Sequence, residues 1–420
     1  LAHRESAICA LVLHTHRPRN RERESVCVCV CICVWIDVME TVRAGWESAL
    51  DTAPLASVIF GSYLTFLVLG SWLLPGRRET GVEIGKKKKR LEYKFNGLLL
   101  HVVSMGSFLV GSILGWIPGT IIYDNFAGLL LVVNCFAFSQ VLFLYFKGKY
   151  FSREPAEFGL PLENQGLLMD LWMGVEVNPR LFGLDLKFFA YRPSMTGWTL
   201  VNASFAFVQY QQTGTLSAAM ILYQVLTNLY VLDYFYNEPK MITTWDIIAE
   251  RFGFMLVWGD YVFIPFYFSL QCWVLIDMDG DLSPAYVAAN LAVFLLGFYI
   301  FRSANSQKHT FKESLKSKKE ILIWGKKPQV ITTETGSQLL ISGFWGIARK
   351  MNYTGDLLMA ISYCMPTGLH SVLGWAYFAY LFTLLVHRAH RDNMHCAQKY
   401  KESWKEYCKK VPYTLIPYIY

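Results

Sequence analysis

Long apolar stretches recur along this chain from residue 56 onward, and short polar loops separate them. The first three stretches each approach the ~20 residues that an α-helix needs to cross the hydrocarbon core of a bilayer. The predicted membrane helices are residues 56–75, 97–118, 126–146, 197–210, 218–235, 252–276 and 284–301. Because open strands cannot satisfy their backbone groups in lipid, the pattern predicts an all-α polytopic integral membrane protein.

The basic residues between these stretches indicate which side of the membrane each loop faces. The run KKKKR at 86–90 lies between the first two predicted helices, and basic loops of this kind stay in the cytosol. Alternation of the helices then places the Lys-rich loop 302–335 and the tail after Arg388 on the same side. Charge and alternation predict one topology, with membrane lipids around the helices.

The composition agrees with lipid as the solvent, because 54% of the residues are apolar or aromatic and only 17% are charged. The net charge of +7 does not indicate a nucleic-acid partner, since the basic residues lie in loops and form no face interleaved with aromatic side chains. The ten cysteines include no CxxC pair, so we predict neither a disulfide framework nor a zinc site. His387, His390 and His395 are close in sequence, but the other histidines are isolated, and no metal site is expected.

The first residues form a segment unlike the rest of the chain. The chain begins with Leu, and residues 26–34 read VCVCVCICV, an alternation that a repeated GT dinucleotide would encode. We therefore expect residues 1–38 to be a non-native or disordered extension of translated upstream sequence, with Met39 as the native start. Residues 39–55 would then form a short segment before the first membrane helix.

Two polar stripes with helical spacing stand out near the C-terminus. The members of the first are four residues apart and those of the second three or four, which places each set along one face of a helix. The first consists of Arg388, Asp392, Cys396 and Tyr400, with Tyr407 following, and the second of Trp345, Arg349, Asn352 and Asp356. Cations, a carboxylate and flat rings suit an anionic ligand with a planar head. An ordinary ion pair on a solvated tail is the alternative, but these charges follow directly on the apolar run FAYLFTLLV and emerge at a membrane surface.

Other polar groups lie inside or beside the predicted membrane helices, where ionisable side chains are costly and often functional. Tyr230 and Asp233 lie inside one helix and Glu238 follows it, while Asp246 and Asp260 come later. Helix-packing hydrogen bonds are the alternative for each residue alone; for the group, a buried polar site is favoured.

Cations beside the last of these helices suit the phosphates of a dinucleotide. Arg302, Lys308 and Lys312 form this set, although lipid headgroups could also explain a lysine here. The sequence contains no P-loop and no GxGxxG that opens a helix after a strand, so a nucleotide would be held in a non-Rossmann manner.

Several long motifs, in the same order, resemble those of the membrane sterol reductases, a family that includes delta-14 and delta-7 sterol reductases and the lamin B receptor. The resemblance runs from about residue 91 to residue 420. The motifs are EYKFNGLLLH (92–101), VEVNPR (175–180), RPSMTGW (192–198), TTWDIIAERFGFMLVWGD (243–260), ANSQKHTF (304–311), SGFWGIARKMNYTGDL (342–357) and HRAHRDNMHCAQKY (387–400).

The resemblance implies about ten transmembrane helices, residues 56–301 forming the N-terminal ones, and a cytosol-facing C-terminal region, 302–420, that binds NADPH. It also implies a multi-pass protein of the endoplasmic reticulum membrane that takes its sterol substrate from the bilayer. The cofactor contacts that it implies are Lys308, Lys312, Leu340, Trp345, Asn352, Tyr353, Arg388, Asp392, Cys396, Lys399, Tyr400 and Tyr407.

Smaller signals favour the delta-14 branch of this family. Ser306 stands where delta-7 enzymes tend to have His, and the ending VPYTLIPYIY is similar to that of delta-14 members. The chain also departs from the family pattern. Lys312 replaces a usual Arg, which weakens a bidentate phosphate contact, and Lys350 replaces a common His. Asn393 replaces an acidic residue after Asp392.

The implied substrate determines the chemistry that we expect. An isolated alkene is not electrophilic, so an acid must protonate carbon 15 as hydride from NADPH reaches carbon 14. We predict Tyr230 as the proton donor or relay, supported by Asp233 or Glu238. Residue identity alone leaves the donor, the exact sterol and the oligomeric state open.

Three alternatives to this function stay open at the level of sequence. A delta-7 sterol reductase would use the same cofactor in a differently shaped pocket. A prenylcysteine carboxyl methyltransferase has a C-terminal motif similar to RKMNYTGD and HRAHRD, but it uses S-adenosylmethionine and does not explain residues 91–310. A scaffold like the lamin B receptor needs a chromatin-binding N-terminal domain, for which the ~55 residues before the first membrane helix are too few.

Overall fold

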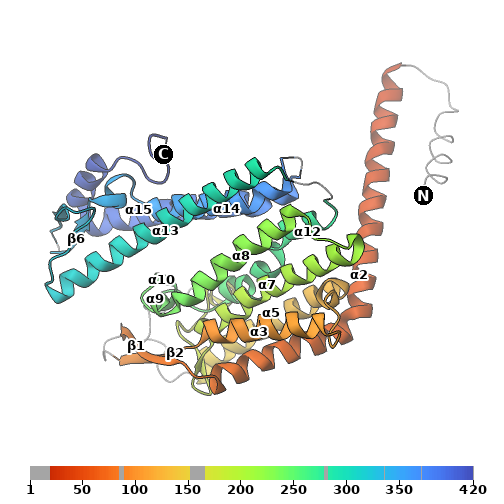
Figure 1. Cartoon of the computed structure of the whole chain (residues 1–420), viewed down its shortest axis with the longest axis horizontal. Helices are drawn as coiled ribbons and strands as arrows, with labels where there is room; N and C mark the ends of the chain where they lie inside the picture. The colour runs from red at the N-terminus through yellow and green to blue at the C-terminus, as the bar shows by residue number, and fades with distance from the viewer. Residues whose placement is uncertain are drawn as a thin grey trace. The chain divides into compact units, whose positions relative to one another are not determined.

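The computed structural model describes residues 19–84, 89–151, 166–278, 282–334, 336–369 and 371–419, with the backbone alone for residues 19–42, 82–84, 89, 245 and 316. Helices dominate the described chain, and its strands form short two-stranded hairpins (Figure 1). The expectation for residues 1–38 lies outside the described residues as far as residue 18. Helix α2 (Arg19–Leu73) then runs without a break into the first predicted membrane helix.

Among the described residues, four helical segments are long and apolar enough to cross a membrane. They are Arg43–Leu73, Phe126–Phe151, Phe254–Ile276 and Pro284–Leu315, and Gly97–Ile113 is a shorter apolar helix. Each overlaps a predicted membrane helix, so a helical membrane protein is confirmed. The number of ten membrane helices and the separate cofactor-binding region stay predictions.

The chain forms two compact units. One contains Leu1–Phe60 and Asn125–Val132, and the other contains Gly61–Asp124 and Val133–Tyr420. In the first unit, α5 (Phe126–Phe146) approaches α2 closely at Gly128, where an added Cβ atom would lie 2.5 Å from the Thr52 Oγ1 atom. The hydrogen of glycine is therefore required at this helix contact.

Helix α7 (Leu186–Thr213) is the most buried helix of the larger unit. It contacts α3 (Gly97–Ile113), α8 (Ala218–Tyr236), the π-helix η2 (Gly259–Tyr267) and α12 (Leu270–Ile276). Small polar residues on α7, among them Ser194, Thr199 and Asn202, are fully buried. Small side chains let helices approach closely in a membrane, where packing replaces the hydrophobic effect between helices.

The remaining short elements connect these helices. They are β1 (Arg77–Ile84), β2 (Lys89–Phe95), α4 (Ile121–Asp124), η1 (Lys147–Phe151), α6 (Leu167–Met173), β3 (Arg180–Leu181), β4 (Leu184–Asp185), α9 (Glu238–Met241), α10 (Trp245–Ile248) and α11 (Phe254–Trp258). Strands β1 and β2 pair antiparallel with Arg77 opposite Phe95, as do β3 and β4 with Arg180 opposite Asp185.

The C-terminal part of the larger unit is built on α13 (Pro284–Ser317), α14 (Met351–Cys364) and α15 (Ala376–Lys410), and α13 and α14 lie side by side (Figure 1). Gly297 and Gly355 bring α13 and α14 into backbone contact, since a Cβ atom on Gly297 would lie 2.7 Å from the Gly355 carbonyl oxygen. The antiparallel hairpin of β5 (Val330–Thr332) and β6 (Gln338–Leu340) and the short helices η3 (Gly343–Gly346), η4 (Met365–Thr367) and η5 (Leu373–Trp375) complete this part.

Two local predictions are wrong. The loop expected at 302–335 is helical as far as Ser317, because residues 302–317 contain neither Gly nor Pro and include several strong helix formers. The stripe of Trp345, Arg349, Asn352 and Asp356 does not follow one helix face, since Trp345 lies in the 3₁₀ helix η3 and α14 begins only at Met351. Arg349 instead donates hydrogen bonds to the Val411 and Pro412 carbonyl oxygens, at 2.9 and 3.0 Å, which attaches the C-terminal tail to the start of α14.

Candidate cofactor and catalytic site

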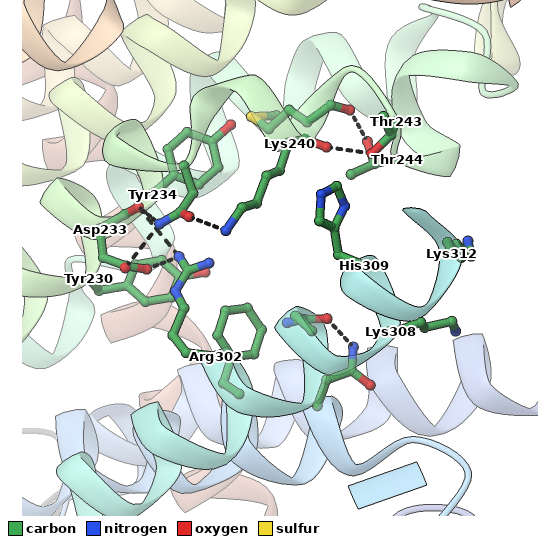
Figure 2. A pocket seen from close by; sticks show the side chains of 15 residues that line it. Tyr230, Asp233, Tyr234, Lys240, Thr243, Thr244, Arg302, Lys308, His309 and Lys312 are labelled. Carbon is green, nitrogen blue, oxygen red and sulfur yellow. Dashed lines mark hydrogen bonds and ion pairs between the residues drawn. The ribbon is translucent and has the colours of Figure 1, made fainter. Parts of the chain in front are cut away.

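A cavity of about 380 Å³ lies between α8, α9, α13 and α14 (Figure 2). It brings together Tyr230 and Asp233, which were predicted as catalytic, with Lys308, Lys312 and Asn352, which were predicted to bind the cofactor. The rest of its lining is Tyr234, Asn237, Lys240, Met241, Thr243, Thr244, Phe301, Arg302, Asn305 and His309. Polar and cationic side chains therefore make up most of the cavity lining.

Helix α8 places Tyr230 and Asp233 on the same face, three residues apart. The Tyr230 ring packs edge-on against Trp198 and Tyr363, with ring centroids 6.2 and 6.3 Å away. The Tyr230 hydroxyl interacts electrostatically with the Asp356 carboxylate and the Arg302 guanidinium. This hydroxyl consequently lies where aromatic packing meets the charged part of the cavity.

Asp233 forms an ion pair with Arg302 of α13 and accepts a 3.2 Å hydrogen bond from the Asn237 amide. Both partners donate to the carboxylate, so they fix its position. Asp233 is therefore an organising group of the cavity wall.

Glu238 lies outside the lining of this cavity. Its carboxylate accepts a 3.0 Å hydrogen bond from the Gly97 amide and pairs with the Arg192 guanidinium at 3.3 Å. Arg192 also donates to the Ser71 hydroxyl and to the Lys94 carbonyl oxygen. Glu238 thus ties α9 to α3 and α7, and the structure does not bring it together with Tyr230.

Lys308 extends along α13 away from Tyr230, and its ammonium group lies 4.1 Å from the centre of the Trp345 ring. The indole N–H of Trp345 donates to the Ala304 carbonyl oxygen at 2.8 Å, which fixes the ring under the lysine. The charged neighbours of Lys308 are Lys312, Lys350 and Asp392. The positive charge of α13 therefore continues from the cavity toward α15.

Asp392 of α15 forms an ion pair with Lys350. Burial alone would raise the pKa of the Asp392 carboxyl, but the ammonium groups of Lys350 and Lys308 outweigh burial and hold that pKa below its usual range. Arg388, one turn earlier, lies 3.5 Å from the Asp246 carboxylate, and its side chain stays 46% exposed. The Lys350 ammonium lies over the Tyr353 ring, 5.8 Å from the ring centre.

The remaining predicted cofactor residues lie beyond the cavity. Cys396 and Tyr400 pack against the buried cluster of Ile331, Trp404, Tyr407 and Val411, beneath the β5–β6 hairpin. The Lys399 ammonium lies 5.1 Å from the Tyr400 ring centre, and Leu340 packs with Phe311 and Trp345. Tyr407 follows a non-helical residue, Lys401, at φ 45°, so the stripe that begins at Arg388 is continuous only as far as Tyr400.

Comparison with known proteins assigns the chain to a family. Residues 25–420 match the Ergosterol biosynthesis ERG4/ERG24 family. The chain is 41% identical to the Delta(14)-sterol reductase of Arabidopsis thaliana over 358 residues, which cover 85% of this chain and 94% of that protein. The chain belongs to this family.

Further relatives come from distant organisms. The Delta(14)-sterol reductase of the bacterium Methylotuvimicrobium alcaliphilum is 40% identical over 82% of this chain and 79% of its own length. The Delta(14)-sterol reductase TM7SF2 of Mus musculus is 41% identical over 85% of both chains. The resemblance to the membrane sterol reductases, predicted from the motifs, is confirmed.

Sequence analysis missed several residues that line the cavity. Lys240 comes from the four-residue helix α9, and Thr243 and Thr244 come from the turn between α9 and α10, so none of them follows a long helical period. His309 is adjacent to Lys308 in the motif ANSQKHTF, and that adjacency was the one available signal. A turn residue becomes a site residue only through the packing of α9 near α13, which local sequence does not encode.

Proposed function

We propose that this member of the ERG4/ERG24 family is an NADPH-dependent delta-14 sterol reductase of the endoplasmic reticulum membrane. The observation that carries the proposal is the cavity in which Tyr230 and Asp233 meet Lys308, Lys312 and Asn352. Three relatives are named Delta(14)-sterol reductase, which supports reduction of the same double bond of the sterol by this protein. The basic loops support a cavity that opens to the cytosol, with the sterol entering from the bilayer.

The residues present fit NADPH. Lys308 and Lys312 supply positive charge for phosphate groups, and lysine is a common phosphate ligand. The Asn352 side-chain oxygen is buried without a partner among the described residues, while its amide donates to the Asn305 side-chain oxygen at 3.3 Å. An unpaired polar atom in a cavity wall favours a polar ligand there. When bound, NADPH supplies the hydride that carbon 14 receives.

The chain's own residues would handle the proton. Tyr230 donates the hydroxyl proton to carbon 15 of the alkene, and the O–H bond breaks as the new C–H bond forms. The Arg302 guanidinium acts on this oxygen and stabilises the negative charge that develops on it. Asp233 holds Arg302 in place through their ion pair, and the rings of Trp198 and Tyr363 exclude water from one side of the phenol.

The test uses membranes of a host that lacks its own delta-14 reductase. The full chain is expressed there, NADPH is supplied, and the sterols are identified by mass spectrometry. We expect 8,14-diene sterols to disappear and delta-8 sterols to accumulate. Consumption of 5,7-dienes with persistence of 8,14-dienes would assign the delta-7 reaction instead. Well-expressed protein that changes neither class would overturn the proposal.

A further inference from the structure

The proposed reaction leaves one carboxyl group close to Tyr230 without a role, that of Asp356 on α14. Its side chain is partly buried, and it forms no hydrogen bond or ion pair with any other residue that the structure describes. Ionisable groups inside a membrane protein are costly, so those that persist usually have a partner or a function. Asp233 has its partner in Arg302, but Asp356 has none of this kind. Asp356 therefore needs a different explanation.

Helix α14 places Asp356 beside the Tyr230 side chain. Residues four and seven positions apart lie on the same face of a helix, so Asn352, Asp356 and Tyr363 share one face of α14. Asn352 lines the cavity, and the Tyr363 ring packs against the Tyr230 ring with centroids 6.3 Å apart. Asp356 thus lies between a residue of the cavity wall and an aromatic neighbour of Tyr230.

Close packing of α13 against α14 fixes this face. A Cβ atom on Gly355 would lie 2.5 Å from the Phe301 amide nitrogen, so the two backbones touch immediately before Asp356. Phe301 and Arg302 both line the cavity from the α13 side. The backbone of Asp356 is therefore held near Arg302, the cation that acts on the Tyr230 hydroxyl.

The groups that face the Asp356 carboxyl are phenols. Its electrostatic partners are Tyr230 of α8, Tyr363 of α14 and Tyr377 of α15. A carboxyl group removed from water without a paired cation is more stable as the neutral acid than as the carboxylate. Asp356 can consequently hold a proton next to Tyr230.

A proton at this position would solve a problem that the proposed reaction creates. Proton donation leaves Tyr230 as a phenolate, which must regain a proton before the next turnover. With an ionised Asp356, two negative charges would then lie close together in a poorly hydrated site, which is costly. A protonated Asp356 can instead pass its proton to the phenolate oxygen. The transfer is favourable because a carboxylic acid is ordinarily a much stronger acid than a phenol.

We propose that Asp356 is the proton reservoir that returns Tyr230 to its protonated form after each reduction. The Asp356 O–H bond breaks as the Tyr230 O–H bond forms, and the carboxylate that results takes up one solvent proton after the product leaves. Each turnover thus consumes one hydride from NADPH and one proton from solvent. This inference rests on the proposed function, because it completes the proton pathway of the same site.

The experiment compares the first turnover with later ones, using the full chain in detergent. Wild-type protein and the isosteric variant Asp356→Asn are mixed with NADPH and an 8,14-diene sterol, quenched rapidly, and the delta-8 product is measured by mass spectrometry. The first turnover of the variant should proceed at nearly the wild-type rate, because Tyr230 begins with its own proton. Steady-state turnover should fall by about 10²-fold, the lower end of what a positioned acid contributes.

A small carboxylic acid separates a lost proton supply from a structural defect. Sodium formate should restore part of the steady-state rate of Asp356→Asn, whereas sodium chloride at the same ionic strength should not. Asp356→Glu keeps an acid at this position and should retain more activity than Asp356→Asn. The NADPH dissociation constant of Asp356→Asn should stay within about twofold of wild type, since a neutral amide replaces a neutral acid.

The control variant is Glu320→Gln, which makes the same carboxyl-to-amide change on a side chain that is 83% exposed. Both of its rates should equal those of the wild type. For Asp356→Asn, equal loss of the first-turnover and steady-state rates without rescue by formate would indicate a structural role and overturn the inference. An unchanged steady-state rate would overturn it too, as would tighter NADPH binding, which would reveal a carboxylate with no proton to give. Wild-type protein that reduces no 8,14-diene would instead contradict the proposed function.

Discussion

Two groups of charged residues flank the α8–α9 corner, and they differ in what they bind. Arg192 and Glu238 have side chains only 3% and 5% exposed, and their partners are groups of the protein itself. Arg302 and Asp233 also form an ion pair, but they line the cavity and are 26% and 17% exposed. The first group connects secondary-structure elements, whereas the second presents charge to an open space.

The comparison explains why acidic residues five positions apart have different roles. Helix α8 keeps Asp233 on the face that meets α13, but the chain turns at Asn237, and Glu238 begins the short helix α9. That turn directs Glu238 toward Arg192 on α7. Charge in a membrane protein is costly, so each group needs a reason to persist. For Arg192 and Glu238 the reason is attachment of α9, and for Asp233 and Arg302 it is the proposed chemistry.

The largest effect should come from Tyr230→Phe, which removes the proposed proton donor and leaves the ring packing intact. We expect turnover of the 8,14-diene to fall by about 10²- to 10⁴-fold, the range that positioned acids contribute. NADPH binding and the melting temperature should remain close to wild type, because the edge-on contacts with Trp198 and Tyr363 persist. Turnover near the wild-type value in purified enzyme would exclude Tyr230 as the donor.

Arg192→Met should separate the structural group from the cavity group. The substitution leaves the Glu238 carboxylate buried without its cation, which typically costs about 3–5 kcal/mol. Thermal unfolding in detergent should show a strongly lowered melting temperature. The double variant Arg192→Met with Glu238→Gln should recover part of the loss, because it removes the unpaired charge. Normal stability of the single variant would show that the pair does not hold the fold.

Lys308→Met should weaken cofactor binding without lowering stability, the opposite of the effect expected for Arg192→Met. Its ammonium group is not part of any ion pair among the described residues, and the methionine side chain can still cover the Trp345 ring. We expect NADPH to bind roughly tenfold more weakly while the melting temperature stays constant or rises. A fall in stability without a change in nucleotide affinity would move Lys308 into the structural group.

The sequence predicts the helices better than it predicts the cavity, for a physical reason. The apolar run 284–301 had to be helical in lipid, and Ser283 caps the helix by accepting a hydrogen bond from the Tyr286 amide at 3.3 Å. Arg349, in contrast, has the spacing of a ligand residue but binds the C-terminal tail, 62 residues later. Lys240 reaches the cavity only through a turn. Long-range contacts decide both cases, and periodicity carries no information about them.

Asp246→Asn should have the smallest effect and tests the boundary between the two groups. Asp246 is 32% exposed and lies 3.5 Å from the Arg388 guanidinium, while the carbonyl oxygen of the same residue accepts from the buried Lys187 ammonium at 2.6 Å. Exposed ion pairs contribute about 0–1 kcal/mol, so the unfolding free energy should change by no more than that amount and less in high salt. The backbone contact with Lys187 persists in the variant and keeps the turn in place.

The same variant reports on the cofactor site. Because the neutral amide no longer offsets the charge of Arg388, NADPH should bind to Asp246→Asn as well as to wild type or slightly more tightly, whereas Arg388→Gln should weaken binding. Titration of both variants with NADPH measures the two effects side by side. Weaker NADPH binding by Asp246→Asn would mean that the carboxylate positions Arg388 for the cofactor, and the acidic turn would then belong to the site as well as to the fold.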